Sequence, residues 1–352
     1  MTTPHDLPAW GTSGVVEVRT PIVDVSEDEE FTRLLDDFPP DIREIVRPRI
    51  REVEEVTFAL GQRVEVAYRD LRVVYDRVIE SRDLMHLDTG GLFRADGRRG
   101  IEGTLHRISR FTDISGDEEA GQSGKTNLIK VRVARVLAGV AEPLRDVLYR
   151  MRRGLLIVGP PGVGKTTLLR DMLRILQELY TNKLLVVDTS LEICGEGAQP
   201  HPFLRNANRV MVGHPTRQKA VINLAIMNGG ASLLAFDEIG YRDDVGLVQW
   251  GAQRGIMPIG SVHGYTILDV VRSPTLRPLV GLRADGSKNE LEASAFGMLI
   301  EVRGKGEFRV FLDVDQAIRD LEAGLTPVFE DIRLQVADNR TERMMGVQQI
   351  GA

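Results

Sequence analysis

A glycine-rich segment in the middle of the chain has the residue types needed to hold the phosphates of a nucleotide. It follows a short apolar run, residues 155–158, and fits the pattern G-x-x-x-x-G-K-[ST]. Its residues are Gly159, Pro160, Pro161, Gly162, Val163, Gly164, Lys165, Thr166 and Thr167. Glycines let successive backbone N–H groups converge on phosphate oxygens, and the N-terminus of the helix expected next adds a positive end. The segment therefore predicts an ATP-binding site.

Two side chains of this segment have specific expected roles. The ammonium group of Lys165 is expected to reach the β- and γ-phosphates of ATP. The hydroxyl of Thr166 can complete the ligand shell of a Mg²⁺ ion, so Mg²⁺ is the expected cofactor. A second Gly-Lys-Thr triplet, at 124–126, has Glu119 where the pattern needs its first glycine, and no apolar strand precedes it. We interpret that triplet as part of a solvated linker.

A second apolar run, residues 233–236, ends in the carboxylates of Asp237 and Glu238. At the end of a buried strand, Asp237 is expected to hold Mg²⁺ through water. Glu238 is expected to polarise the attacking water as a general base. Acids at a strand end can also act only as a cap, and this pattern alone leaves that alternative open. The phosphate-binding segment upstream favours the catalytic role.

Two further strand ends carry polar side chains that could face the same nucleotide. The run 184–187 continues into Asp188 and then Glu192, and another run ends at Val262, just before His263. Ligands of an open parallel sheet bind outside the carboxyl ends of its strands, so we expect Asp188 and Glu192 at the nucleotide crevice, with Glu192 catalytic. We interpret His263 as a sensor of the γ-phosphate. The alternatives are a helix cap at Asp188 and a structural histidine.

The elements that must position these residues alternate along the second half of the chain. Short apolar runs are separated by amphipathic segments, of which the one at about 165–180 has leucines and Met172 along one face. Buried runs of this length between helices predict an α/β fold with a parallel sheet and helices on both faces. Upstream of residue 115, a helical pattern after Pro39 and short β-like runs predict a smaller α+β domain.

Composition divides the 352 residues into five expected segments. Acidic residues and prolines give the N-terminal arm little to bury, and acid, glycine and serine cluster without apolar periodicity in the linker. The segments are a flexible acidic arm at 1–37, an N-terminal α+β domain at 38–115, a linker at 116–124, a P-loop ATPase domain at 125–320 and a C-terminal tail at 321–352.

Charge and composition exclude several classes of protein. A net charge of −6 argues against a protein that mainly coats duplex nucleic acid, and a hydrophobic content of 42% excludes wholesale disorder. The single cysteine, Cys194, excludes an internal disulfide framework and is interpreted as a small apolar filler. No apolar run is long enough to span a membrane, and the N-terminus lacks the parts of a signal peptide. We therefore expect a cytoplasmic protein.

Taken together and in order, the motifs resemble a known family. The strings are GPPGVGKTTLLRDM from Gly159, VVDTSLEI from Val186, FDEIG from Phe236 and GSVHGYT from Gly260. They resemble AAA-type ATPases of the stage III sporulation protein AA family, which has cyanobacterial and plastid relatives and is akin to type II/IV secretion ATPases. The stretch 97–109 also resembles that family, and the resemblance covers about residues 38–315. It implies a RecA-like P-loop domain, with the acidic and histidine boxes of the secretion ATPases at Asp188–Glu192 and His263.

The resemblance implies a Mg²⁺-dependent ATPase that converts ATP and water to ADP and phosphate. It further implies a homo-oligomeric ring, with six subunits expected. The ring would drive conformational change in a partner protein assembly, and that assembly could be associated with a membrane. The main alternative is a nucleic-acid-binding motor or remodeller that uses the basic stretches 43–51 and 98–110, so single-stranded nucleic acid stays open as a partner. A scaffold that binds ATP and hardly hydrolyses it is disfavoured, because the chain has both Glu192 and Glu238.

The arginines of residues 98–110 are candidates to complete the active site of a neighbouring subunit. P-loop ATPases commonly receive a positive charge in trans that stabilises the transition state. Among these arginines we name Arg99 and Arg107 as catalytic candidates, with Arg98 and Arg110 beside them. The alternative is a solvated, turn-rich face without a catalytic role.

Overall fold

The computed structural model describes most of the chain as two compact units. The described residues are 15–89, 91, 93–94, 96–113, 124–212, 217–240, 242–287 and 294–336. The first unit comprises the described parts of Met1–Ile22, Gly139–Met172 and Ser232–Ala352, and the second those of Val23–Ala138 and Leu173–Ala231. Among the described residues, no helix is long and apolar enough to cross a membrane.

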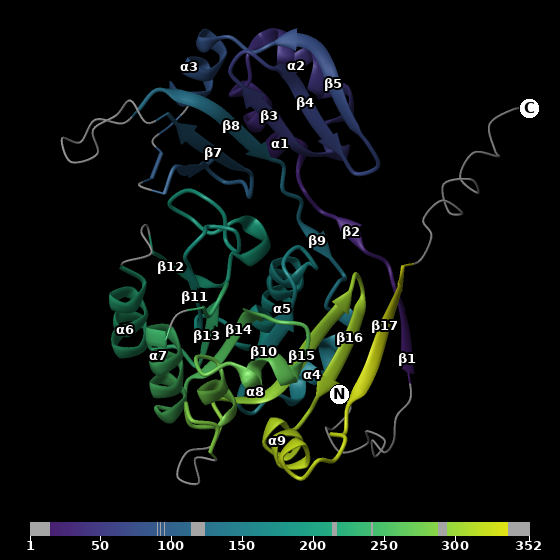
Figure 1. The fold of residues 1–352 in the computed structure, drawn as a ribbon, viewed down its shortest axis with the longest axis vertical. Coiled ribbons are helices and arrows are strands. Elements are labelled where there is room, and N and C mark those ends of the chain that lie inside the picture. Colours follow the sequence, from purple (N-terminus) through teal and green to yellow (C-terminus); the bar gives the residue numbers. More distant parts are fainter. Residues whose placement is uncertain are drawn as a thin grey trace, which may run out of the picture. The chain divides into compact units, whose positions relative to one another are not determined.

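The first unit is built on a mixed sheet (Figure 1). Its strands, in spatial order, are β1 (Val15–Thr20), β17 (Glu330–Val336), β16 (Glu307–Phe311), β15 (Phe296–Gly304), β10 (Gly154–Gly159), β14 (Met257–His263) and β13 (Leu233–Phe236). The neighbours β15, β10, β14 and β13 are parallel, whereas β16 is antiparallel to both β15 and β17. The α/β class is therefore confirmed, and the expected parallel sheet is extended by an antiparallel strand into a mixed sheet. The reason is a tight hairpin at Lys305–Gly306, where Gly306 has a φ of 77°.

One helix of the first unit begins where the sequence pattern places it. The helix expected at about 165–180 is α5 (Lys165–Leu179), which follows β10 directly and continues into the second unit. Leu168, Leu169, Met172 and Leu176 are buried, as the periodicity predicts, whereas Leu179 at the end of the helix is 52% exposed. The other helices are α4 (Arg145–Arg150), α7 (Arg242–Gln253), α8 (Ile267–Arg272) and α9 (Val314–Glu322), with short 3₁₀ helices at Glu142–Leu144 and Arg277–Val280.

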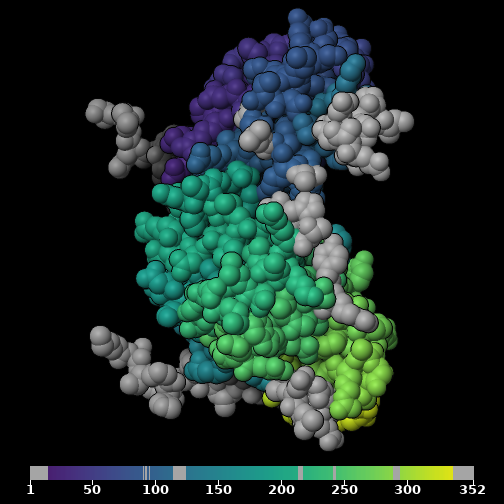
Figure 2. Space-filling view, turned by 90° about the vertical axis from the view of Figure 1, so that its left-hand side faces the viewer, coloured from purple at the N-terminus to yellow at the C-terminus, as the bar shows by residue number. Residues whose placement is uncertain are grey.

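The second unit contains a six-stranded antiparallel sheet. Its spatial order is β5 (Arg72–Val78), β4 (Arg63–Tyr68), β3 (Val53–Ala59), β8 (Thr126–Arg132), β7 (Arg107–Thr112) and β6 (Arg98–Gly100). Its helices are α1 (Asp28–Asp36), α2 (Pro40–Val46) and α3 (Ser81–Thr89), with a 3₁₀ helix at Arg47–Glu52. In the space-filling view the residues coloured purple to blue form one compact body (Figure 2).

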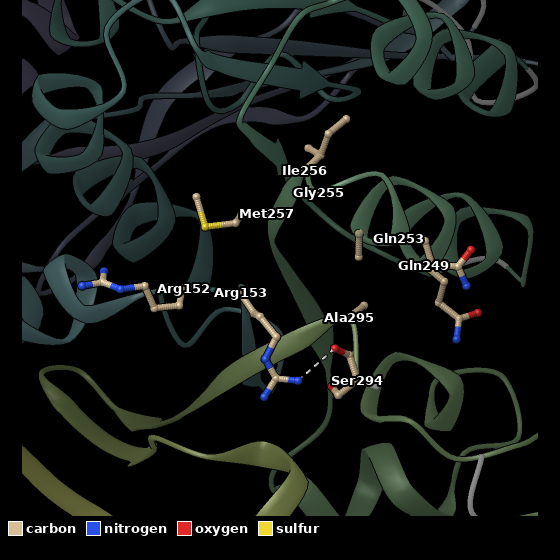
Figure 3. A pocket seen from close by; sticks show the side chains of 10 residues that line it. Arg152, Arg153, Gln249, Gln253, Gly255, Ile256, Met257, Ser294 and Ala295 are labelled. Carbon is tan, nitrogen blue, oxygen red and sulfur yellow. Dashed lines mark hydrogen bonds between the residues drawn. The ribbon is translucent and has the colours of Figure 1, made fainter. Parts of the chain in front are cut away.

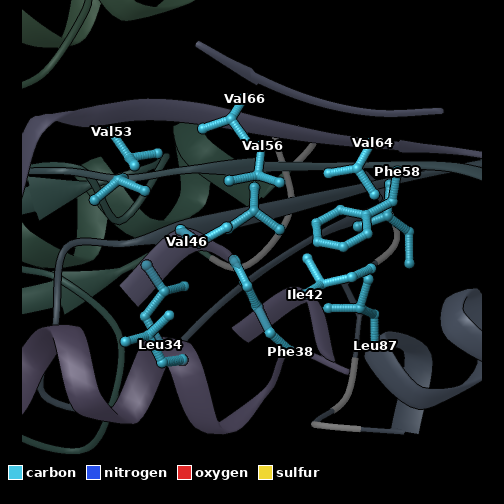
Figure 4. Packing of buried hydrophobic residues seen from close by; sticks show 14 of the residues in the cluster. Leu34, Phe38, Ile42, Val46, Val53, Val56, Phe58, Val64, Val66 and Leu87 are labelled. Carbon is cyan, nitrogen blue, oxygen red and sulfur yellow. The ribbon is translucent and has the colours of Figure 1, made fainter. Parts of the chain in front are cut away.

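The core of this body joins the helices to one face of the sheet (Figure 4). Phe38 and Phe58 meet edge to face with ring centroids 5.3 Å apart, and Ile42 and Val56 pack beside them. Each such side chain contributes about 1.5–3 kcal/mol through burial. The alternating burial of β4, with Val64 and Val66 inside, explains why the short runs upstream of residue 115 form strands.

The second unit also includes the chain that follows α5. Strands β11 (Leu184–Asp188) and β12 (Asn208–Met211) are parallel, and α6 (Gln218–Asn228) follows them. A two-stranded antiparallel ribbon is made by β2 (Val23–Asp24) and β9 (Leu137–Ala138). A 3₁₀ helix occupies Pro202–Leu204.

The expected arm, ATPase domain and tail have different bounds from the elements that the structure shows. The expected arm at 1–37 includes β1 and α1, because Phe31, Leu34 and Leu35 give α1 a buried face despite its acidic start. The expected ATPase domain from residue 125 begins with β8, which pairs with β3 and β7 of the six-stranded sheet. The expected tail from 321 includes β17. Most of the expected linker, residues 116–123, lies outside the described residues.

Candidate active site

The phosphate-binding segment connects the end of β10 to the start of α5, as its sequence pattern predicts. Gly162 and Gly164 have φ values of 75° and 103°, in the left-handed region that other residues rarely adopt. No described atom lies within 4 Å of a Cβ built on either residue, so it is the backbone conformation that requires glycine here. This turn leaves the backbone next to α5 open for the close approach of a ligand.

Lys165 is held under this turn by three acceptors. Its ammonium Nζ donates to the carbonyl oxygens of Gly159 at 2.8 Å and Pro160 at 3.1 Å, and it lies 3.1 Å from Nδ1 of His263. An ammonium group has three donors and no acceptor, so Nδ1 of His263 accepts. Burial lowers the pKa of Lys165, while the nearby carboxylates of Glu238 and Asp237 act in the opposite direction.

The proton of the neutral imidazole is thereby assigned to the other nitrogen of His263. Nε2 lies 3.0 Å from Oε1 of Glu238, so the ring donates there. A continuous chain of hydrogen bonds therefore runs from Lys165 through His263 to Glu238. The side chain of Glu238 is about half exposed, with 52% of its surface accessible, which leaves it open to water and ligands.

Thr166 and Asp237 form a second contact beside this chain. The hydroxyl of Thr166 donates to Oδ1 of Asp237 at 3.2 Å, and Ser261 donates to the backbone carbonyl oxygen of Asp237 at 2.7 Å. The Asp237 side chain is buried. A hydroxyl and a carboxylate oxygen this close are ligands of the kind that Mg²⁺ prefers.

The oxygens of Thr166 and Asp237 fit a Mg²⁺ ion that is shared with a nucleotide. Among the described residues, no group of three or more His, Cys, Asp or Glu side chains could hold a metal by itself. Mg²⁺ commonly keeps several waters and binds through one or two protein ligands together with substrate phosphates. Thr166 and Asp237 would be the two protein ligands in such a mode of binding.

The two acids at and beyond the end of β11, Asp188 and Glu192, belong to the second unit and have different partners. Asp188 is buried and accepts hydrogen bonds from the backbone N–H groups of Ile193 at 3.4 Å and Cys194 at 2.7 Å. Asp188 therefore fixes the turn that follows its own strand, a role close to the capping alternative. Glu192 forms an ion pair with Arg107 of β7. Cys194 is buried, as a filler would be.

The segment after Glu192 is attached to the loop before β7. Glu196 exchanges backbone hydrogen bonds with Gly103 and Thr104, at 3.0 and 3.2 Å, and its carboxylate accepts from the N–H of Gly100 at 3.0 Å. A Cβ on Gly195 would lie 2.4 Å from the carbonyl oxygen of Thr104, so the backbones at these two residues pack closely together. The segments that carry Glu192 and Arg107 are thus joined by hydrogen bonds within the second unit.

Two other arginines of the stretch 98–110, Arg99 and Arg110, have partners within the second unit. Arg99 is buried, pairs with Asp37 at 2.8 Å and donates to the carbonyl oxygen of Leu87 at 2.9 Å. In this arrangement Arg99 is a structural arginine, and the expectation of a catalytic role is not supported by its surroundings. Arg110 pairs with Asp88 at 3.1 Å.

A pocket of about 520 Å³ lies elsewhere on the first unit (Figure 3). Arg153, Met257 and Ala295 line it and stand at or just before the starts of β10, β14 and β15. His263 ends β14, and Lys165 and Glu238 follow the corresponding ends of β10 and of its near neighbour β13. The pocket is therefore at the opposite edge of the sheet from the candidate active site.

Two residues near the site were not singled out from the sequence. Ser261 supports Asp237 from within β14, and nothing in its local pattern marks it. Glu301 is a buried carboxylate inside β15 that accepts a hydrogen bond from the N–H of Ile267 at 2.7 Å. A charged residue within the apolar run 296–302 was the signal that could have identified it.

Comparisons with known proteins agree with the motifs. Residues 123–285 match the model of the family described as Sporulation stage III, protein AA. The chain is 30% identical over 330 residues to the uncharacterized protein ycf45 of Porphyra purpurea, covering 88% of this chain and 56% of that one. It is 29% identical over 261 residues to stage III sporulation protein AA of Bacillus subtilis (strain 168), covering 69% of this chain and 83% of that one.

The chain is also similar to a plant protein that is much longer. It is 29% identical over 341 residues to the protein SEEDLING PLASTID DEVELOPMENT 1 of Arabidopsis thaliana, covering 90% of this chain and 48% of that one. The chain thus spans about half the length of the Porphyra and Arabidopsis proteins.

Among solved structures, the chain resembles the pilus retraction motor PilT with bound ADP. The TM-score is 0.52 at 14% identity, with 87% of each chain covered. The ATPase DotB of Yersinia pseudotuberculosis gives a TM-score of 0.50 at 12% identity, covering 82% of this chain and 83% of that one. At these identities the likeness concerns the fold. The predicted resemblance is thus confirmed: residues 123–285 match the stage III sporulation protein AA family, and the chain shares its fold with PilT.

Proposed function

We propose that this chain is a Mg²⁺-dependent ATPase that converts ATP and water to ADP and phosphate. The observation that carries the proposal is the hydrogen-bonded chain from Lys165 through His263 to Glu238, directly beside the Thr166–Asp237 contact. These groups lie at the end of β10 and its neighbours, where a nucleotide held by the turn at 159–164 would place its phosphates. Release of phosphate from ATP by the purified chain tests the activity.

In this proposal each residue has a distinct role. The backbone N–H groups of the turn hold the phosphates, and Lys165 exchanges its carbonyl acceptors for the β- and γ-phosphate oxygens. Thr166 and Asp237 would hold Mg²⁺, which would supply positive charge beside the phosphates. Glu238 accepts the proton of the attacking water, and His263 links Glu238 to the lysine that contacts the γ-phosphate. Glu192 stays a second candidate for the catalytic carboxylate.

We further propose that the chain works as a homo-oligomeric ring, with six subunits expected, in the cytoplasm. A single P-loop domain seldom supplies every positive charge that its transition state needs. Among the arginines of the stretch 98–110, Arg107 is our candidate to act on a neighbouring subunit. Its ion-pair partner within the chain is Glu192, the second candidate for the catalytic carboxylate, so a change at Glu192 would be felt by Arg107. The ring would transmit hydrolysis to a partner protein assembly. Many arginines of the basic stretches 43–51 and 98–110 are paired with acids within the chain, which favours this function over nucleic-acid binding.

Mixing two inactive variants tests the ring. Arg107→Ala subunits would lack the charge supplied to a neighbour, and Lys165→Ala subunits would lack their own phosphate contact. Some interfaces of a mixed ring hold one intact site, so the mixture should recover part of the wild-type ATPase rate, measured as phosphate release. A mass measurement that gives a monomer at every concentration with ATP present, together with full turnover, would contradict the ring.

A further inference from the structure

Glu301 is a buried carboxylate close to the candidate active site that has no role in the account so far. Only 2% of its surface is exposed, and it lies in the middle of β15. The strand register places it beside Val158 of β10, and Val158 lies beside Val262 of β14. Glu301 is therefore level with the residues that immediately precede Gly159 and His263.

The backbone that Glu301 contacts belongs to the segment that begins with His263. Oε1 of Glu301 accepts the N–H of Ile267, the first residue of α8, at 2.7 Å, and Ile267 is itself buried. A buried N–H that loses its acceptor pays a desolvation cost, so this contact constrains where the segment lies.

The rest of the segment between His263 and Ile267 is fixed by other contacts. Oδ2 of Asp269 accepts the N–H groups of Tyr265 at 2.7 Å and Thr266 at 3.0 Å. A Cβ on Gly264 would lie 3.2 Å from the side chain of Val158, so this residue packs closely on the strand of the phosphate-binding turn. Glu301 thus attaches the end of this segment to β15 through a hydrogen bond to its side chain.

Burying a carboxylate in this place has a free-energy cost. Burial raises the pKa of Glu301, opposed by the hydrogen bond from Ile267 and by the charge of Arg309 on the neighbouring strand β16. An apolar side chain at position 301 would avoid this cost but would leave the buried N–H of Ile267 without its acceptor. The two effects on stability therefore oppose each other, and a test of Glu301 must separate stability from catalysis.

We propose that Glu301 is a positioning residue for ATP hydrolysis: by holding the N–H of Ile267, it fixes His263 where the ring bridges Lys165 and Glu238. The proposal rests on the ATPase function proposed above. Glu301 acts through the backbone of residues 263–267 and touches none of the reacting atoms. Loss of this hydrogen bond would let the ring shift, and small displacements of an oriented group reduce rates by up to about 100-fold.

The test compares Glu301→Gln with Glu301→Met in the full-length chain. Gln keeps an oxygen that accepts from Ile267, whereas Met has similar size and no acceptor of that kind. We expect Glu301→Met to lower kcat for Mg·ATP by about 10- to 100-fold, with KM and the Kd for a fluorescent ATP analogue within about twofold of wild type. Glu301→Gln should restore most of kcat. Asp313→Ala, which removes the cap of α9 next to the same sheet, is the matched control and should leave kcat unchanged.

A second variant removes the same hydrogen bond from its donor side. Ile267→Pro deletes the N–H at the first position of α8, where proline is favoured, and Thr266 before it is already extended. It should lower kcat in the same way as Glu301→Met.

Unchanged kcat in a folded Glu301→Met or Ile267→Pro chain would overturn the positioning role, as would an equal loss of kcat in Glu301→Gln. Failure of both Glu301→Met and Ile267→Pro to fold would also overturn it, because it would assign the contact to stability. If wild type itself releases no phosphate while it binds ATP, the proposed function fails rather than this inference.

Discussion

Replacing Lys165 with alanine is expected to weaken the binding of Mg·ATP by about 100-fold or more and to abolish turnover. Lys165 is buried, and its ammonium group lies between the phosphate-binding turn and His263. Each hydrogen bond to a charged group contributes about 1.5–3 kcal/mol, and two such contacts to phosphate oxygens account for this loss. Titration of a fluorescent ATP analogue measures the change in Kd.

The matched control for this variant is Lys183→Ala. Lys183 is exposed, and its ammonium donates only to the carbonyl oxygen of Gly230, at 3.3 Å, among the contacts described for it. Its loss should leave the Kd for ATP unchanged. A folded Lys165→Ala chain that binds ATP with wild-type affinity would contradict the assignment of the phosphate-binding turn.

Replacing Glu238 with glutamine is expected to retain ATP binding and to lower kcat by about 10²- to 10⁴-fold, the usual contribution of a general base. Glutamine keeps the oxygen that accepts from Nε2 of His263 but cannot take the proton of the attacking water. Quenched-flow measurement of bound ATP and ADP after a single turnover checks this, because the variant should hold unhydrolysed ATP.

Glu192→Gln is the informative comparison for Glu238→Gln. Glu192 is paired with Arg107, so its loss should affect the proposed communication between subunits more than the bond-breaking step. If Glu192→Gln stalls single-turnover hydrolysis and Glu238→Gln does not, the role of the general base belongs to Glu192.

The candidate site was largely predictable because its residues follow strand ends. A local pattern identified the turn at 159–167, and apolar runs that end in polar residues identified Asp237, Glu238 and His263, which lie beside it. These residues come together because β13, β14 and β10 are neighbours in one parallel set. The strand-end rule was applied to Asp188 and Glu192, which contact Cys194 and Arg107 instead. The α/β class followed from the same alternation of apolar runs and helices.

What could not be predicted depends on contacts between residues distant in sequence. Arg99 was a catalytic candidate because arginines cluster around it, and only the fold shows that Asp37 neutralises it. The role of Glu301 depends on the position of Ile267, which no spacing in the sequence reveals. The expected boundary at residue 125 was wrong because β8 pairs with β3, which lies about 70 residues earlier in the chain.

The account as a whole depends on whether the cluster of Lys165, His263 and Glu238 hydrolyses ATP. The most direct measurement is phosphate release by the purified full-length chain with ATP and Mg²⁺, next to the same reaction with excess chelator and to Glu238→Gln with Mg²⁺. The account predicts steady release by wild type with Mg²⁺, and loss of that release in both other reactions. Equal release by wild type and Glu238→Gln, or release that persists after Mg²⁺ is removed, would contradict it.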